Sequence, residues 1–172
     1  MLWDARTGTK RRTFPTLDKR LLALAFAPSN HFLFVGGTGP IYRVALPEGT
    51  VDGVQGGHQI GVACLRASPN PAIVASTGLD GTLRFWTVVG GQEVNCVPLG
   101  AQGVLQLAFA PDGRSVAVAT TGAVLRLSAP DGELLARHEV SVDGVYGVAF
   151  SPDGRWLANA AADGRVRVWD LR

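Results

Sequence analysis

Apolar residues recur in one distinctive arrangement at four places along the chain. An apolar residue is followed three positions later by a second one, then by a Phe or Ala, an Ala or Ser, and a proline. The four copies span residues 21–28, 62–69, 104–111 and 145–152, so that successive prolines are 41 or 42 residues apart. A spacing this constant predicts a chain built from repeated structural units.

A second landmark keeps the same spacing. It is a Trp-Asp pair, or an apolar replacement of it, and it falls at Trp3, Val44, Trp86, Leu127 and Trp169, again at intervals of 41 or 42 residues. Two unrelated landmarks in one register indicate that the repeat is real and covers the whole chain.

The pattern within each unit is typical of strands. In the second unit an apolar run at 72–75 is followed by the turn residues Asp80-Gly81, an alternating run at 82–86 and a more polar run at 92–97. Each unit therefore predicts four short antiparallel strands, and none has helical periodicity. Because isolated hairpins are only marginally stable in water, we expect the units to pack their faces against one another.

Repeats of this length, with four strands and a third strand ending in Trp-Asp, resemble the WD-repeat β-propeller family. The resemblance implies an all-β fold of WD-type β-propeller blades, four per chain. The second unit is the best copy, with Gly57-His58, Ser76, Asp80 and Trp86, whereas the first and third units lack the Trp.

In this family such residues form a hydrogen-bonded chain that locks a blade, which implies a structural tetrad of His58, Ser76, Asp80 and Trp86. The physical logic is that a buried indole N–H and a turn carboxylate both need partners. The same residue types could suggest a catalytic triad. Because Trp86 ends the chain of contacts, we expect no free nucleophile and no catalytic residue.

The repeat register divides the chain into four blades at residues 15–56, 57–98, 99–140 and 141–172. The last blade ends without a fourth strand, and we expect a strand within residues 1–14 to supply it. This pairing would remove two exposed strand edges at once.

Three kinds of closure compete. A four-bladed ring must turn about 90° per blade and an eight-bladed ring about 45°, and closely packed WD-type faces favour the smaller turn. The preferred prediction is that two chains pair as a homodimer to make an eight-bladed ring. A four-bladed monomer is one alternative. The other is a cut through a longer array, because Leu2-Trp3-Asp4 repeats the ending at Val168-Trp169-Asp170.

The resemblance implies a scaffold that binds a protein or peptide, mostly on the face that holds the loop before each first strand. Seven residues are candidates for that face: Arg20, Gln59, Ile60, Leu79, Gln102, Asp143 and Tyr146. One alternative function is a C-terminal structural module or fragment of a larger propeller-containing signalling or sensor protein. A distant third is an enzyme with its site in the propeller funnel.

Composition narrows the remaining function classes. With a net charge of +2, the chain has no overall field to attract nucleic acid or a membrane surface, and the basic stretch at 10–12 suits a charged strand edge. Cys64 and Cys96 are expected on the innermost and outermost strands of one blade, about 14 Å apart, too far for a disulfide. Reduced thiols predict a cytoplasmic location. No His/Cys spacing or glycine-rich loop suggests a metal or a cofactor.

Overall fold

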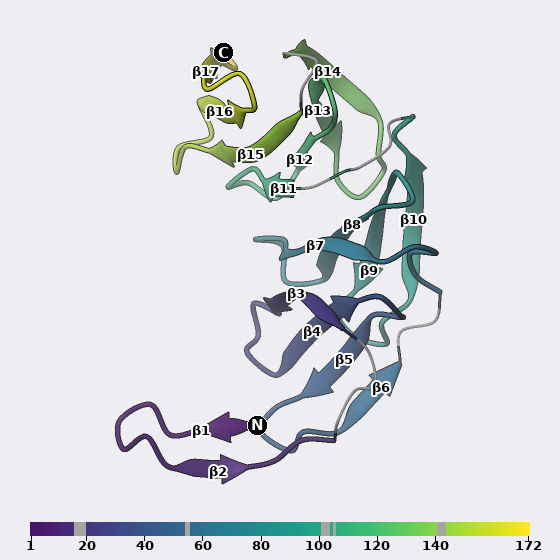
Figure 1. Ribbon diagram of the computed structural model, residues 1–172, viewed down its shortest axis with the longest axis vertical. Coiled ribbons are helices and arrows are strands. Elements are labelled where there is room, and N and C mark those ends of the chain that lie inside the picture. Colours follow the sequence, from purple (N-terminus) through teal and green to yellow (C-terminus); the bar gives the residue numbers. More distant parts are fainter. Residues whose placement is uncertain (16–19, 54–55, 101–103, 105, 141–143) are drawn as a thin grey trace.

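The computed structural model describes residues 1–15, 20–53, 56–100, 104, 106–140 and 144–172. Within these ranges every regular element is a β-strand. The same ranges contain no helix that is long and apolar enough to span a membrane. The strands form three four-stranded antiparallel sheets, one three-stranded sheet and a separate two-stranded hairpin. Figure 1 shows these sheets following one another along an open arc, with the two chain termini far apart.

Each of the four larger sheets corresponds to one sequence repeat. Blade 1 contains β3 (Leu21–Phe26), β4 (Phe32–Gly37), β5 (Tyr42–Ala45) and β6 (Val51–Gly53). Blade 2 contains β7 (Val62–Ala67), β8 (Ile73–Gly78), β9 (Thr82–Thr87) and β10 (Glu93–Pro98). Blade 3 contains β11 (Gln106–Phe109), β12 (Ser115–Ala119), β13 (Ala123–Ser128) and β14 (Leu134–Glu139). Blade 4 contains β15 (Val145–Phe150), β16 (Trp156–Ala161) and β17 (Val166–Asp170).

The first strands β3, β7, β11 and β15 contact one another in sequence and so form the inner side of the arc. In each blade the later strands follow outward by antiparallel pairing in chain order. The predicted positions of the two cysteines are confirmed. Cys64 lies on β7 and Cys96 on β10, at opposite edges of one sheet, and both are free.

The hydrophobic core lies between blades and is divided into three layers. On β9, Leu83 and Phe85 belong to the layer between blades 2 and 3, whereas Trp86 belongs to the layer between blades 1 and 2. On β12, Val118 packs toward blade 2 and Ala119 toward blade 4. Because successive side chains of a strand point to opposite faces, strands that are apolar at nearly every position fill two core layers at once.

The two ends of the arc expose positions that are buried in its middle. Leu24 of β3 is 60% exposed, whereas Leu65, at the same repeat position in blade 2, is 0% exposed. At the other end Val168 of β17 is 58% exposed and its blade 2 counterpart, Phe85, is 0% exposed. We call the outward side of blade 1 the upstream face and that of blade 4 the downstream face. Both faces carry exposed apolar side chains of the kind that fill the interblade layers. The upstream face is partly covered, because Val44 is only 4% exposed and borders a pocket that Met1, Phe14 and Pro15 also line.

The N-terminal segment forms a hairpin of β1 (Leu2–Trp3) and β2 (Lys10–Arg12). Its register is that of the third and fourth strands of a further blade, because Trp3 takes the landmark position. The hairpin lies near blade 1, where the Arg12 side chain donates a hydrogen bond to the Glu48 carbonyl at 2.7 Å. It is therefore at the opposite end of the arc from β17 (Figure 1).

Two predictions are wrong for the single chain. An N-terminal strand does not complete blade 4, and the four blades do not close into a ring. The hairpin strands pair with each other, and the sheet of blade 4 ends at β17. The physical reason is geometric, because the three interblade layers turn the chain through only part of a circle and leave its ends apart. Completion of blade 4 by a strand from a second chain stays a prediction.

Candidate functional site

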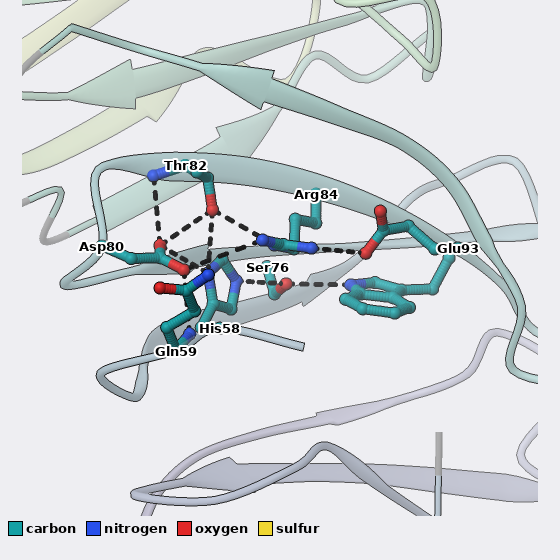
Figure 2. Close-up of polar contacts among 8 residues, drawn as sticks. His58, Gln59, Ser76, Asp80, Thr82, Arg84 and Glu93 are labelled. Carbon is teal, nitrogen blue, oxygen red and sulfur yellow. Dashed lines mark hydrogen bonds and ion pairs between the residues drawn. The ribbon is translucent and has the colours of Figure 1, made fainter. Parts of the chain in front are cut away.

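Blade 2 brings its four predicted tetrad residues into one hydrogen-bonded chain (Figure 2). The Trp86 indole N–H donates to Ser76 Oγ at 2.8 Å, and Ser76 Oγ lies 2.8 Å from His58 Nε2. His58 Nδ1 in turn lies 2.9 Å from Asp80 Oδ1. The residues come from β9, β8, the loop before β7 and the turn after β8, so the chain crosses the whole blade.

The donors and acceptors of this chain determine the protonation of His58. An indole N–H can only donate, so Ser76 Oγ accepts from it and directs its own proton to His58 Nε2. Nε2 is then unprotonated, and the ring proton lies on Nδ1, from which it is donated to the Asp80 carboxylate. His58 is therefore a neutral imidazole when every member of the chain has a partner.

Burial and hydrogen bonding act in opposite directions on the two titratable groups. Burial lowers the pKa of His58 below its ordinary value, against the opposing effect of Asp80. Burial would raise the pKa of Asp80, but hydrogen bonds from His58, Thr82 and the Gln59 backbone N–H outweigh it and lower this pKa to about 2. The pair at neutral pH is thus a neutral histidine beside an ionised aspartate.

The geometry removes Ser76 from any nucleophilic role. Its side chain is 0% exposed, and its oxygen is occupied by Trp86 on one side and His58 on the other. A substrate carbonyl could reach this oxygen only by displacing the buried indole. Ser76, His58 and Asp80 therefore share the connectivity of a catalytic triad without its access to solvent.

Three further residues extend the network beyond the predicted four. Thr82 donates from its backbone N–H and its hydroxyl to Asp80 Oδ1, at 3.2 and 2.8 Å. Arg84 donates to Thr82 Oγ1 at 3.2 Å and to Glu93 Oε2 at 2.7 Å. The sequence alone gives little indication that these residues join the network, because Thr, Arg and Glu are common at exposed strand positions. Their connection depends on how close the side chains lie in the sheet.

Gly78 is another residue that the sequence pattern did not single out. A Cβ at this position would lie 2.2 Å from His58 Nδ1 and 2.8 Å from Asp80 Oδ1. The imidazole therefore occupies the volume that a side chain would fill, and only glycine allows the ring to lie against β8.

Blade 4 contains an incomplete version of the tetrad. Trp169 packs on the His138 ring with centroids 4.6 Å apart, and Asp163 accepts a hydrogen bond from Arg167 at 2.6 Å. Asn159 takes the position of Ser76 and is buried, and neither of its amide atoms has a partner among the described residues. The position of His58 corresponds to residue 141, which lies outside those residues.

The loop that carries two of the predicted face residues is attached directly to the tetrad. The Gln59 backbone N–H donates to Asp80 Oδ2 at 3.0 Å, next to the His58 contact. The Leu79 N–H donates to the Gly61 carbonyl at 3.1 Å, which brings the turn after β8 beside the loop before β7. Exposed Gln59, Ile60 and Leu79 thus belong to one hydrogen-bonded corner of blade 2.

The same corner bond recurs in other blades and defines one face of the arc. Thr38 N–H donates to the Arg20 carbonyl in blade 1 at 3.0 Å, and Ala162 N–H donates to the Gly144 carbonyl in blade 4 at 3.0 Å. Arg20 is exposed at this face, and Tyr146 is exposed on β15 itself instead of in a loop. The candidates Gln102 and Asp143 lie outside the described residues.

The described residues contain no group of three or more His, Cys, Asp or Glu side chains that could hold a metal ion.

Comparison with known proteins connects this repeat to a family and to a longer relative. The sequence model described as "WD domain, G-beta repeat" matches residues 49–87 and 132–170. Each match runs from the fourth strand of one blade to the third strand of the next. The chain is also 30% identical over 145 residues to "Transcription factor unc-37" of Caenorhabditis elegans. This match covers 82% of the chain and 24% of the relative, so the chain spans about a quarter of that protein's length.

The central hydroxyl of the tetrad provides a first test. Ser76→Ala leaves the Trp86 N–H and His58 Nε2 buried without a partner, which should lower the free energy of unfolding by about 1–3 kcal/mol. The neighbouring Thr77→Val is the matched control, because the buried Thr77 hydroxyl has no hydrogen-bond partner among the described residues. Its loss should be neutral or stabilising. Urea denaturation of both variants at pH 7 measures the difference, and equal effects would contradict the importance of the Ser76 contacts.

The lowered pKa of Asp80 provides a pH test. Because its folded pKa of about 2 is below the ordinary value of 3.8, its charge stabilises the folded state above pH 4, and this contribution is lost as the pH falls toward 2. The difference in unfolding free energy between the wild type and Asp80→Asn should therefore shrink by about 2 kcal/mol between pH 5 and pH 2. Denaturant titrations across this range measure it. A difference that stays constant with pH would show that the carboxylate charge has no stabilising role.

Proposed function

Because this chain belongs to the WD-repeat family, we propose that it is a non-catalytic scaffold that binds a protein or peptide partner. The observation that carries the proposal is the corner of blade 2, where Ile60 and Leu79 are 62% and 42% exposed beside a buried hydrogen-bonded tetrad. Apolar side chains held in place in water lose little conformational entropy on binding and gain from desolvation. This combination favours a binding surface over a solvated loop.

The proposed binding face consists of the corners of the blades on the side of the loops before the first strands. Arg20, Gln59, Ile60, Leu79 and Tyr146 are its candidate contacts, and Gln102 and Asp143 are assigned to it from the repeat register alone. We assign the tetrad of blade 2 a structural role, which is to hold the Gln59 loop through Asp80. On this proposal a change at Asp80 affects binding indirectly, through the position of the loop.

The alternative function is a structural module within a larger propeller-containing signalling or sensor protein. It is supported by the relative named above, of which the chain covers 24%, and by the third-strand ending at Trp3 in the N-terminal hairpin. The relative's name, which describes a transcription factor, supports a nuclear location, and the cytoplasmic location stays a prediction from cysteine usage. An enzyme with a site in the propeller funnel stays the third possibility, and reproducible turnover by the purified chain would favour it.

Ring closure by a second copy of the chain is also proposed. The proposal is supported by the presence of both an upstream and a downstream face. Each of them exposes side chains whose counterparts in the middle blades are buried in the core. Two copies related by a twofold axis would bring each upstream face against a downstream face and cover both pairs. The ring would then have four blades from each chain, with the N-terminal strand of one copy beside β17 of the other.

The binding face is tested by a double variant with a matched control. Gln59→Ala with Leu79→Ala should weaken capture of the partner about tenfold or more, because central apolar contacts dominate interface energies. The control, Val89→Ala with Gln92→Ala, likewise removes one aliphatic side chain and one glutamine, from an exposed turn at the opposite end of blade 2. Pull-down followed by mass spectrometry and a titration of the identified partner compares them. If the first variant still binds with wild-type affinity, the proposed face is wrong.

Ring closure is tested by molar mass in solution. The chain has a mass of 18.1 kDa, so a dimer should give about 36 kDa in light scattering. Leu24→Asp or Val168→Asp places a charge on an end face and should return the protein to the monomer mass, whereas Val89→Asp, away from both faces, should not. A folded wild-type monomer at micromolar concentration would exclude the dimer.

A further inference from the structure

Two arginines occupy the same register position in different blades. Arg43 on β5 and Arg126 on β13 each come one residue before the landmark that ends the third strand. In the part of the chain that the structure describes, both have a buried Nε atom without a hydrogen-bond partner. Since the two side chains start from equivalent backbone positions, the differences between their surroundings come from the neighbouring residues alone.

Arg43 has partners for the rest of its guanidinium group. Nη2 donates to Asp52 at 2.9 Å, and Nη1 donates to the Val88 carbonyl of the next blade at 3.3 Å. The guanidinium carbon lies 4.8 Å from the centre of the Phe32 ring, at cation–π distance. A carboxylate, a carbonyl and an aromatic face therefore compensate the charge of Arg43.

Neither a carboxylate nor an aromatic ring stands opposite Arg126 at the register positions that Asp52 and Phe32 take beside Arg43. Asp52 is directly opposite Arg43 in the sheet, whereas Ala136 is directly opposite Arg126, beside Leu135 in a strand irregularity. Ser115 takes the register position of Phe32. Among the residues that the structure describes, no ion pair or hydrogen bond involves the Arg126 side chain. Its charge is therefore uncompensated within this part of the chain.

The Arg126 side chain lines a cavity of about 350 Å³ between blades 3 and 4. Arg114 and Ser115 also line this cavity, together with the apolar residues Leu135, Phe150 and Leu171. We call this the blade 3–4 cavity. Its wall combines positive hydrogen-bond donors with apolar side chains, as expected for a site that takes an anionic group on a short hydrocarbon stem.

Two carboxylates also border the cavity, and both are held by their own turns. Asp112 accepts the Arg114 backbone N–H at 2.9 Å, and Asp153 accepts the Ser151 hydroxyl at 2.5 Å and the Arg155 backbone N–H at 3.1 Å. Neither forms an ion pair with Arg126. Their negative charge would repel a doubly charged phosphate more strongly than a singly charged carboxylate, which narrows the chemistry of the ligand.

We propose that the blade 3–4 cavity binds the carboxylate of a Glu or Asp side chain from a peptide partner. Arg126 would bind this carboxylate as Arg43 binds Asp52 in blade 1. A guanidinium group suits this contact because it offers a carboxylate two parallel N–H donors. Arg114 and Ser115 supply further donors, and Leu135, Phe150 and Leu171 cover the methylene groups. The site lies at the turns between first and second strands, at the opposite end of the sheets from the Gln59 corner, so it is independent of the face proposed above.

The test uses two small probes that differ only in charge. N-acetyl-glutamate amide carries the carboxylate, and N-acetyl-glutamine amide replaces it by a neutral amide. In nitrogen-15 NMR spectra, the Arg126 Nε–H signal should shift saturably with the glutamate probe and stay unchanged with the glutamine probe. Inorganic phosphate is titrated in parallel.

Three variants locate the effect. Arg126→Gln should weaken binding of the glutamate probe about tenfold or more, because it removes a charge-assisted hydrogen bond. Arg43→Gln, at the same register in blade 1, is the matched control and should bind with wild-type affinity. Leu135→Asp should supply the internal carboxylate that blade 1 has at Asp52, and thereby abolish probe binding while the protein stays folded by circular dichroism.

Each remaining outcome contradicts the proposal. Equal binding of the glutamate and glutamine probes would show that no carboxylate is recognised. Wild-type affinity in either Arg126→Gln or folded Leu135→Asp would show that Arg126 is not the receptor group. Binding of inorganic phosphate without binding of the glutamate probe would overturn the assignment to a carboxylate.

Discussion

The packing of each sheet between two neighbours is the constraint on which the rest of this structure depends. A strand such as β9 directs Phe85 into one core layer and Trp86 into another, so neither layer belongs to a single blade. A four-stranded sheet with two apolar faces is unstable in water by itself and becomes stable when both faces are covered. The shared core layers and the arc of blades follow from this rule, and the upstream and downstream faces are where it is not satisfied within one chain.

Polar contacts add specificity where the apolar layers cannot. Packing positions Trp86, but its indole N–H needs an acceptor in the core, which is Ser76. Ser76 contacts His58, His58 contacts Asp80, and Asp80 accepts the backbone N–H of Gln59 in the surface loop. The buried network therefore transmits order from the core to a loop that faces solvent. In blade 3 the situation is the opposite, because Arg126 lines a cavity and its Nε has no hydrogen-bond partner among the described residues. A satisfied network stabilises the blade, and an unsatisfied group becomes available to a ligand.

Sequence reasoning was most successful where a property depends on local order along the chain. The repeat of 41 or 42 residues and the short strands of each unit follow from spacing and alternation. The family resemblance added the contacts of His58, Ser76, Asp80 and Trp86. It did not add Thr82, Arg84 or Gly78, since their roles depend on how close the imidazole lies to neighbouring strands.

The sequence by itself determined the all-β class, the number of blades and the order of strands within each blade, because alternation and turn residues act over a few neighbouring positions. Only the tertiary structure decided which residues at equivalent positions differ in environment. Leu24 and Leu65 have the same place in the repeat, yet one is exposed and the other buried. Arg43 and Arg126 share a register, yet among the described residues only Arg43 forms an ion pair. The physical reason is that burial and charge compensation depend on side chains contributed by other strands and blades, whose approach no local pattern encodes.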